Sequence, residues 1–342
     1  KLTINEKTKA VTNIKITASS TTITKLPFSL NETGNQRAKL TIIDDPVTFD
    51  DNYFFSLKIA EKIKILEIND LEESKYLDAL FLNDPLFDFQ KVNINRVEYS
   101  SFSNYNLILL NSLKSISSGL IQELKKYVSN GGNIILIPGT EIDYPSYTSL
   151  AQNLNFRPYI RLVAAESRIK NLEIENELFK GVFEKEKIKE NIDLPKIKKY
   201  FELSSSGFAK EEPLLRLETG NIFLDKFSSG KGKVYVFTTP FIKEYTNFVE
   251  HALFVPVMFK LTLNSVKSDM KFYKVGKNET IELNNQKSIS ESSAHIVNKD
   301  NNFDIIPEIR NMNDKTYLDQ NNSIKNASFY DLLIDGKIEN VL

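Results

Sequence analysis

The sequence predicts an α/β protein in which a central domain of alternating strands and helices is flanked by β-rich segments. Short runs with period-two alternation fill residues 1–61, and strand-length apolar runs alternate with helical patterns from Lys62 onward. The pattern returns to short strands beyond Lys267. A length of 342 residues exceeds that of one ordinary domain, which favours several domains.

Residues 1–61 are predicted to be part of an immunoglobulin-like β-sandwich. Short alternating runs separated by polar turns are typical of such sandwiches, but these runs are too few for a complete domain. We therefore expect the later part of one. The chain opens at Lys1 in strand-like alternation, so we expect it to be a piece of a larger protein. The expected strands are Leu2–Ile4, Asn13–Thr17, Thr22–Leu26, Lys39–Ile43 and Tyr53–Ile59.

Residues 62–266 are predicted to form a flavodoxin-like α/β domain. Strands that alternate with helices imply a mostly parallel sheet covered on both faces. The charge-dense stretch Ala164–Leu203 breaks this alternation and is interpreted as an irregular insertion. The expected strands are Ile63–Ile68, Lys91–Val97, Leu107–Leu110, Asn133–Ile137, Leu214–Leu217, Ile222–Lys226 and Lys233–Phe237, and the expected helices are Glu72–Leu82, Ser115–Ser129 and Phe248–Leu263.

Residues 267–342 are predicted to form a small, truncated β domain. Polar residues predominate there, and the Asn-rich stretches are interpreted as loops. The expected strands are Phe272–Val275, Thr280–Leu283, Ala294–Val297 and Ser328–Ile334.

The composition excludes several kinds of chemistry. The 44 basic and 45 acidic side chains nearly cancel, so no net field attracts the chain to nucleic acid, and we expect no nucleic-acid partner. The sequence has no cysteine, which removes thiol nucleophiles and cysteine-ligated metals, and its two histidines leave little for metal ligation. We expect neither a metal nor a cofactor. Apolar runs are far shorter than a membrane-spanning helix requires.

The order of several motifs resembles a class I glutamine amidotransferase-like domain. More narrowly, it resembles the version found in bacterial membrane proteins with an aerotolerance-regulator type N-terminal double-transmembrane domain. The end of the preceding immunoglobulin-like module in that family is matched by Asp44-Asp45 and by the run from Phe49 to Phe54. The motifs of the α/β domain that carry the resemblance are Ile63–Asp70, Asn104–Asn111, Leu124–Gly132 with Pro138-Gly139, Gly230–Phe241 and Phe254–Met258.

The sequence departs from an active amidotransferase at the residues that matter for catalysis. Such an enzyme needs a cysteine thiolate on the turn after a central strand, with a histidine beside it. The corresponding turn here reads Pro138-Gly139-Thr140-Glu141, and no histidine is near it in sequence. Thr140 is therefore interpreted as a turn residue, with a hydroxyl nucleophile as the weaker alternative. We expect no catalytic residue.

Five residues are candidates for ligand binding because they follow the carboxyl ends of predicted central strands. Open α/β sheets bind ligands at this edge, where the strand order reverses. Asparagine and aspartate are also ordinary turn and helix-cap residues, and that interpretation is the favoured one for these positions. The candidates are Asn69, Asp70, Asn111, Gly139 and Thr140.

Two functions follow as hypotheses. The first is a non-catalytic binding or scaffold region of a membrane-anchored bacterial protein, with protein partners at the membrane and an unknown small-molecule ligand, if any. The resemblance implies that the membrane is reached through segments outside this chain and that the region lies on the periplasmic face of the inner membrane. The alternative is a hydrolase that acts on a small or sugar-like ligand with carboxylates and hydroxyls in the α/β cleft.

Overall fold

The computed structural model of the chain divides into two compact units, one of Lys1–Glu61 with Ser268–Leu342 and one of Lys62–Lys267. The two β segments 1–61 and 267–342 were expected as separate domains but belong to one unit. They are joined because strand β16, Asp269–Lys271, pairs with strand β4, Asn52–Ile59. The structure describes residues 1–30, 32–43, 48, 50–70, 75–170, 194–205, 211–266, 269–277, 279–284, 293–312 and 315–342. Asp44, Asp45 and Phe49 of the predicted motif, and most of the predicted insertion, lie outside these residues.

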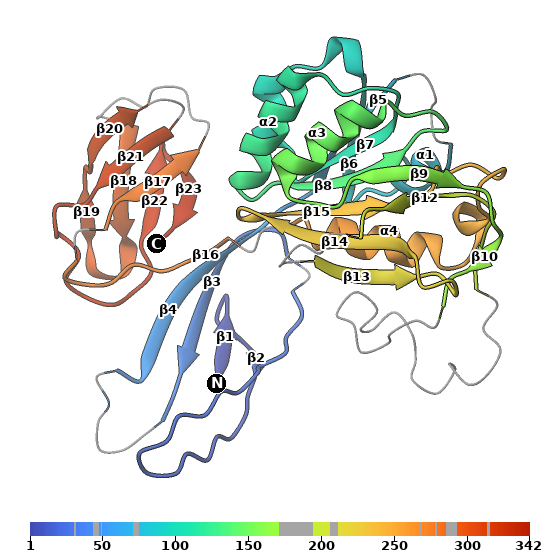
Figure 1. Cartoon of the computed structure of the whole chain (residues 1–342). Coiled ribbons are helices and arrows are strands. Elements are labelled where there is room, and N and C mark those ends of the chain that lie inside the picture. The colour runs from blue at the N-terminus through green and yellow to red at the C-terminus, as the bar shows by residue number, and fades with distance from the viewer. Residues whose placement is uncertain are drawn as a thin grey trace. The chain divides into compact units, whose positions relative to one another are not determined.

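The unit Lys62–Lys267 is built on a seven-stranded sheet of order β13-β14-β15-β8-β7-β5-β6 (Figure 1). Its parallel strands, numbered by chain position, lie in the order 2-1-3-4-5 that defines flavodoxin-like folds. Strands β14 and β13 extend one edge by antiparallel pairing, so the sheet is mixed, with four parallel and two antiparallel strand pairings. The strands are β5 Ile63–Asn69, β6 Phe87–Asn93, β7 Leu107–Leu113, β8 Asn133–Pro138, β13 Glu211–Arg216, β14 Ile222–Ser229 and β15 Gly232–Phe237.

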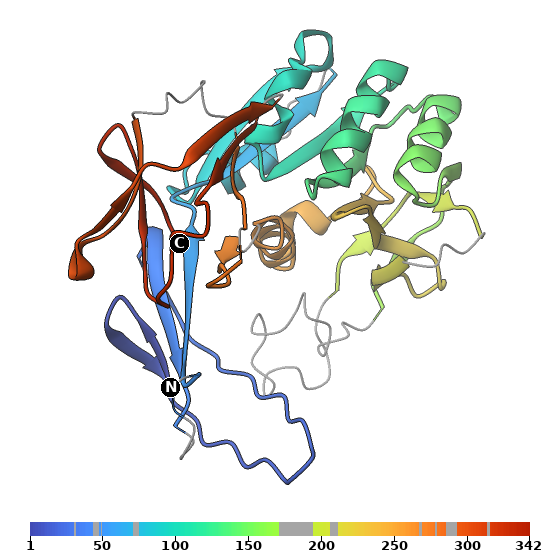
Figure 2. The ribbon, with the colours of Figure 1, turned by 90° about the vertical axis from the view of Figure 1, so that its left-hand side faces the viewer.

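Helices cover both faces of this sheet. Along β7, Leu107 and Leu109 pack in one buried cluster with side chains of α1 and α4, while Ile108 and Leu110 pack in another with α2 and α3. Figures 1 and 2 show α2 and α3 on one face and α4 on the other. This explains why the central strands carry apolar side chains on both faces. The helices are α1 Lys75–Phe81, α2 Ser118–Ser129, α3 Tyr144–Leu154 and α4 Phe254–Leu263, and the short 3-10 helices are Ile94–Arg96, Tyr99–Asn104 and Phe248–Glu250.

Local capping explains where the elements of this unit differ from the predicted ones. The second strand ends at Asn93 and not at Val97, because the Asn93 side chain accepts a hydrogen bond from the Asn95 amide and starts a 3-10 helix. Helix α3 was not predicted, although Asp143 caps it through the Ser146 amide at 3.0 Å. The closing helix starts at Phe254 and not at Phe248.

The predicted insertion is partly ordered β structure. Of its residues, 171–193 lie outside those described. On either side of that gap the chain forms two small antiparallel pairs, β9 with β12 and β10 with β11. The strands are β9 Tyr159–Val163, β10 Ser167–Arg168, β11 Lys196–Ile197 and β12 Tyr200–Leu203.

The other unit, Lys1–Glu61 with Ser268–Leu342, is called the β unit. Its described residues contain three antiparallel sheets, of order β16-β4-β3-β1-β2, β17-β21-β20 and β19-β18-β22-β23. Arg37 on β3 donates to both carboxylate oxygens of Asp331 on β22, at 2.6 and 2.7 Å, which ties the first sheet to the third. The strands are β1 Leu2–Ile4, β2 Lys7–Ala10, β3 Gly34–Thr41, β4 Asn52–Ile59, β16 Asp269–Lys271, β17 Ile281–Asn284, β18 Ala294–Asn298, β19 Phe303–Ile305, β20 Glu308–Met312, β21 Lys315–Asp319, β22 Asp331–Ile334 and β23 Lys337–Val341.

Three predicted strands of this unit are wrong. The described segment 11–30 contains no strand, so Asn13–Thr17 and Thr22–Leu26 are not strands. Their alternating apolar side chains face solvent, as Ile23 does with 91% exposure, because they pack on no sheet. A strand was expected at Phe272–Val275, but the chain forms its strand just before these residues, at β16, where it pairs with β4.

Candidate functional site

The unit Lys62–Lys267 is called the α/β unit. Its candidate site is the edge formed by the carboxyl ends of β5, β7 and β8. The strand order reverses between β5 and β7, and open α/β sheets bind ligands at such a point. The register places Asn69 of β5 directly beside Asn111 of β7. All five residues predicted for ligand binding lie at this edge, namely Asn69, Asp70, Asn111, Gly139 and Thr140.

Asn111 is held by a buried carboxylate below the edge. Its side-chain nitrogen donates to Glu67 Oε1 at 2.6 Å, and both residues are almost fully buried, at 2% and 0% exposure. The Asn111 side-chain oxygen accepts the Ser112 hydroxyl at 3.2 Å. The amide of Asn111 is thus engaged by the protein and fixes the ends of β5 and β7 together. Glu67 was not among the predicted residues, although a charged residue within the apolar run of its strand was a signal.

Asp70 joins the loops that follow three neighbouring strands. Its side chain accepts the backbone amide of Lys114 at 3.4 Å, and its carbonyl accepts the side-chain amide of Asn93 at 2.6 Å. Asp70 therefore acts as the turn residue that the favoured interpretation assigned to it. These contacts join Asp70, which follows β5, to Asn93 at the end of β6 and to Lys114 after β7.

The turns after β7 and β8 approach each other closely. Ser112 adopts the left-handed conformation with φ of 53°, which is uncommon for a residue with a side chain. A Cβ atom at Gly139 would lie 3.3 Å from the Ser112 carbonyl group and 3.3 Å from the Glu141 carbonyl oxygen. A side chain at position 139 would thus require the neighbouring backbone to shift by a few tenths of an ångström, and this residue is buried.

Among the described residues of this edge, the exposed ones include Lys114, Ser115, Thr140 and Glu141. The Lys114 ammonium and the Glu141 carboxylate form an ion pair of 3.3 Å between side chains that are 68% and 79% exposed. Such an exposed pair contributes little to stability, so both charges are available to a partner. Below them, the Tyr245 hydroxyl donates to the Thr140 carbonyl at 3.5 Å, and burial raises the pKa of this phenol.

Both histidines are engaged in contacts with residues outside this edge. His251 Nδ1 accepts the backbone amide of Leu253 at the start of α4, and His295 Nδ1 lies 2.8 Å from an Asp304 carboxylate oxygen in the β unit. In the part of the chain that the structure describes, no group of three or more His, Asp or Glu side chains is placed to hold a metal ion. The described residues of the edge offer hydrogen-bond donors and acceptors, the Lys114 ammonium, and the carboxylates of Asp70 and Glu141.

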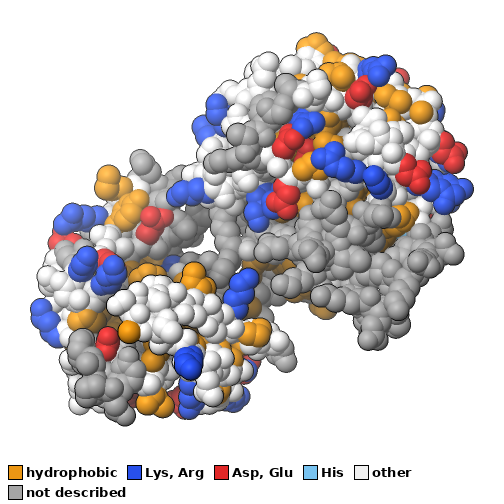
Figure 3. Space-filling view, turned by 60° about the horizontal axis from the view of Figure 1, so that its bottom comes forward, with side chains coloured by type: hydrophobic (Ala, Val, Ile, Leu, Met, Phe, Trp, Pro, Cys, Tyr) orange, Lys and Arg blue, Asp and Glu red, His pale blue; other side chains and the backbone are white. Residues whose placement is uncertain are grey.

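Side chains of both charges are interspersed on the face shown in Figure 3, in keeping with a net charge of −1. Among the described residues, no helix is both long and apolar enough to cross a membrane.

Comparison with known proteins gives distant structural similarity. No family model matches the chain, and no curated protein matches it. The chain is similar to a cytoplasmic protein STM1381 from Salmonella typhimurium LT2, with 16% identity and a TM-score of 0.45 over 60% of this chain and 100% of that one. It is also similar to a putative GMP synthase protein from Thermoplasma acidophilum, with 11% identity and a TM-score of 0.40 over 60% and 95% of the two chains. A putative ThuA-like protein from Bacteroides uniformis has 13% identity and a TM-score of 0.42 over 61% and 91%. The flavodoxin-like assignment rests on the strand order and not on these scores.

Proposed function

We propose that this chain is a non-catalytic binding region of a membrane-anchored bacterial protein, and that its α/β unit presents the carboxyl edge of β5, β7 and β8 to a protein partner. The observation that carries the proposal is the combination at this edge of a fixed backbone with exposed charged and hydroxyl groups. A surface that is held rigid in its binding conformation loses less freedom on association.

Several buried contacts make this edge rigid. Asn111 is fixed by Glu67, as described above. The Tyr147 hydroxyl from α3 donates to the Leu113 carbonyl at 2.6 Å, and the Asp143 amide donates to the Lys114 carbonyl at 2.8 Å. Lys114 is thus anchored through its backbone while its side chain is exposed.

Recognition without turnover agrees with the side chains of the edge. The order of the sequence motifs resembles that of amidotransferase-like domains. The sequence, however, has no cysteine to act as the nucleophile that such enzymes use. The hydroxyl of Thr140 would need a base to become nucleophilic, and Nδ1 of each histidine is engaged in another contact. Lys114 and Glu141 remain as groups that a partner can pair with.

The membrane anchor and the periplasmic location are part of the proposal. They rest on the resemblance of the motif order to membrane proteins of the aerotolerance-regulator type. A protease-sensitive tag placed after Leu342 in the full-length protein tests the location in intact spheroplasts. Cleavage of the tag before lysis is expected, and a tag that is protected until lysis would put the region in the cytoplasm.

Site-specific photocrosslinking in living cells tests the binding edge. A photoreactive amino acid at exposed Thr140 is expected to give a discrete adduct with a partner protein. The matched control is Lys231, which is also exposed but precedes β15 and so lies at the opposite edge of the sheet. Adducts of equal strength from both positions, or none from Thr140, would contradict the proposed edge. Turnover of a small or sugar-like substrate that needs Glu141 would instead support the hydrolase alternative.

A further inference from the structure

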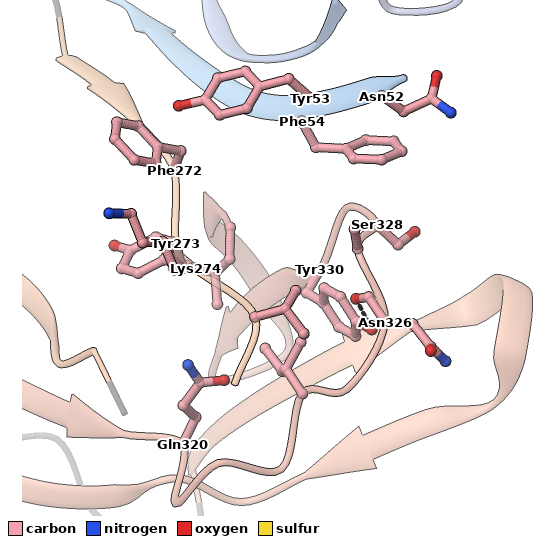
Figure 4. Close-up of a pocket in the computed structure, with 14 residues that line it drawn as sticks. Asn52, Tyr53, Phe54, Phe272, Tyr273, Lys274, Gln320, Asn326, Ser328 and Tyr330 are labelled. Atoms are coloured by element: carbon pink, nitrogen blue, oxygen red, sulfur yellow. Dashed lines mark hydrogen bonds between the residues drawn. The ribbon is translucent and has the colours of Figure 1, made fainter. Parts of the chain in front are cut away.

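The β unit contains a cavity of about 290 Å³ whose residues have no role in the proposed function (Figure 4). Its volume is at the small end of the range of small-molecule sites, about 300–1,000 Å³. The cavity begins where β16 leaves β4, because β16 pairs with Ser56–Lys58 and the chain then diverges. It is lined by Asn52, Tyr53, Phe54, Phe272, Tyr273, Lys274, Val275, Gln320, Ile324, Asn326, Ala327, Ser328, Tyr330 and Leu342.

One wall presents two aromatic rings to solvent. Tyr53 on β4 and Phe272 after β16 are 43% and 42% exposed, and their ring centroids are 5.5 Å apart at an interplanar angle of 53°. Figure 4 shows the two rings next to each other on one side of the cavity. Large aromatic side chains are normally buried to a greater extent, so a pair that flanks a cavity indicates an apolar surface for a ligand.

The other wall carries a buried polar group without a partner. Gln320 is only 5% exposed, and its side-chain nitrogen donates to the Lys277 carbonyl at 3.4 Å. Its side-chain oxygen is buried and has no hydrogen-bond partner among the described residues. Burial of an unpaired acceptor is costly, about 1–3 kcal/mol, and calls for an explanation. A rotation of the Gln320 side chain would turn this oxygen toward the cavity, where a hydroxyl donor would satisfy it.

The surroundings of this oxygen are ordered and nearly uncharged. The Tyr330 hydroxyl, on the same wall, donates to the Asn326 carbonyl at 3.0 Å, which is the dashed line in Figure 4. Lys274 is the one ionisable Lys, Arg, Asp, Glu or His side chain among the lining residues. The cavity thus suits a neutral ligand that has an apolar face and hydroxyl groups at its edge.

We propose that this cavity binds a neutral pyranose ring. The C–H face of a pyranose would lie against Tyr53 and Phe272, and one of its hydroxyls would donate to the side-chain oxygen of Gln320. An extended peptide added to β4 beyond Ser56 is the competing occupant. The sugar is favoured because a buried side-chain amide oxygen, without a hydrogen-bond partner among the described residues, belongs to the wall across the cavity from the rings. The proposal is independent of the α/β edge.

Saturation-transfer NMR with the whole chain tests this site. The probes are methyl β-glucopyranoside, methyl β-galactopyranoside and methyl α-mannopyranoside at millimolar concentration. We expect saturation transfer to at least one of them, because weak binding suits a site for a single ring. Gln320→Leu removes the acceptor at similar size, and Tyr53→Ala removes half of the aromatic pair. Each is expected to raise the Kd at least about tenfold, equivalent to about 1.4 kcal/mol.

Two further variants separate loss of the site from loss of the fold. Tyr53→Phe keeps the ring and is expected to bind as the wild type does. Phe28→Ala changes another exposed aromatic side chain of the same unit, which does not line the cavity, and is also expected to bind normally. Lack of transfer to all three probes overturns the proposal, as does transfer that persists in both Gln320→Leu and Tyr53→Ala. Binding of an extended peptide without any pyranoside would assign the cavity to strand addition instead.

Discussion

Replacing Asp225 by asparagine is expected to change how the stability of the α/β unit depends on pH. Asp225 lies on β14 with 0% exposure. One of its carboxylate oxygens accepts the Lys226 amide at 2.9 Å, and the other has no partner among the described residues. Burial raises the pKa of this carboxyl from 3.8 to about 7, helped by Glu211 and opposed by Arg157.

The direction of the effect follows from this raised pKa. Below pH 3.8 the carboxyl is protonated in both the folded and the unfolded states, so it costs nothing. Between pH 3.8 and about 7 the unfolded state ionises while the folded state keeps its proton, so stability falls as the pH rises. Over the whole interval the loss is at most roughly 4 kcal/mol, because one pKa unit corresponds to about 1.4 kcal/mol. Asparagine resembles the neutral acid at every pH and should abolish this loss.

The assay is urea denaturation at several pH values, followed by far-ultraviolet circular dichroism. Helices α1 to α4 all lie in the unit that contains Asp225, so the helical signal reports on its unfolding. The control is Glu218→Gln, an exposed carboxyl in the turn after β13. We expect Asp225→Asn to become progressively more stable than the wild type as the pH rises to 8, while the control follows the wild type. Parallel curves for Asp225→Asn and the wild type would refute the reasoning.

Substitutions at Gly232, Asn111 and Ser117 test other packing and capping contacts of the α/β unit. Gly232→Ala should destabilise the unit by about 3 kcal/mol or more, because its Cβ would lie 2.0 Å from the Gly132 carbonyl oxygen. Its control is Gly119→Ala in α2, whose Cβ would lie 3.9 Å from the Tyr99 side chain; it should stabilise the unit by about 0.5–1 kcal/mol, and equal effects would contradict this packing. Asn111→Ala removes a hydrogen bond of the buried Glu67 carboxylate, so denaturation should show a loss of about 1–3 kcal/mol, and an unchanged midpoint would mean that this contact is dispensable. Ser117→Ala removes the cap on the Leu120 amide and should cost about 1 kcal/mol, whereas Ser117→Asp should retain the stability.

The sequence allows the central α/β elements to be predicted because their signals are local. Strands β5, β7 and β8 are predominantly apolar, since each carries buried side chains on both faces. Helix α2 combines apolar spacing with the Ser117 cap. Helix α3 has a weaker apolar pattern, so it was not predicted although Asp143 caps it. In the β unit, apolar alternation at 13–17 and 22–26 has the period of a strand, but only pairing with a neighbour makes a strand, and that pairing is not local.

For the candidate site, the sequence could place residues but not their contacts. The positions of Asn69 and Asn111 at strand ends follow from the strand runs, and their adjacency follows from the register. The engagement of Asn111 by Glu67 depends on which face each side chain occupies in the assembled sheet. The sugar cavity combines chain segments that are far apart, around Tyr53, Phe272 and Gln320, so no local pattern could indicate it.

Glutaminase activity is the most direct test of the central proposal that the edge formed by β5, β7 and β8 recognises a partner without turnover. Purified chain and its Thr140→Ala variant are compared for the release of glutamate from glutamine. We predict that both release glutamate at the background rate, because removal of the nucleophile from such a unit costs several orders of magnitude in rate. Release by the wild type that clearly exceeds that of Thr140→Ala would contradict the claim and make Thr140 a nucleophile.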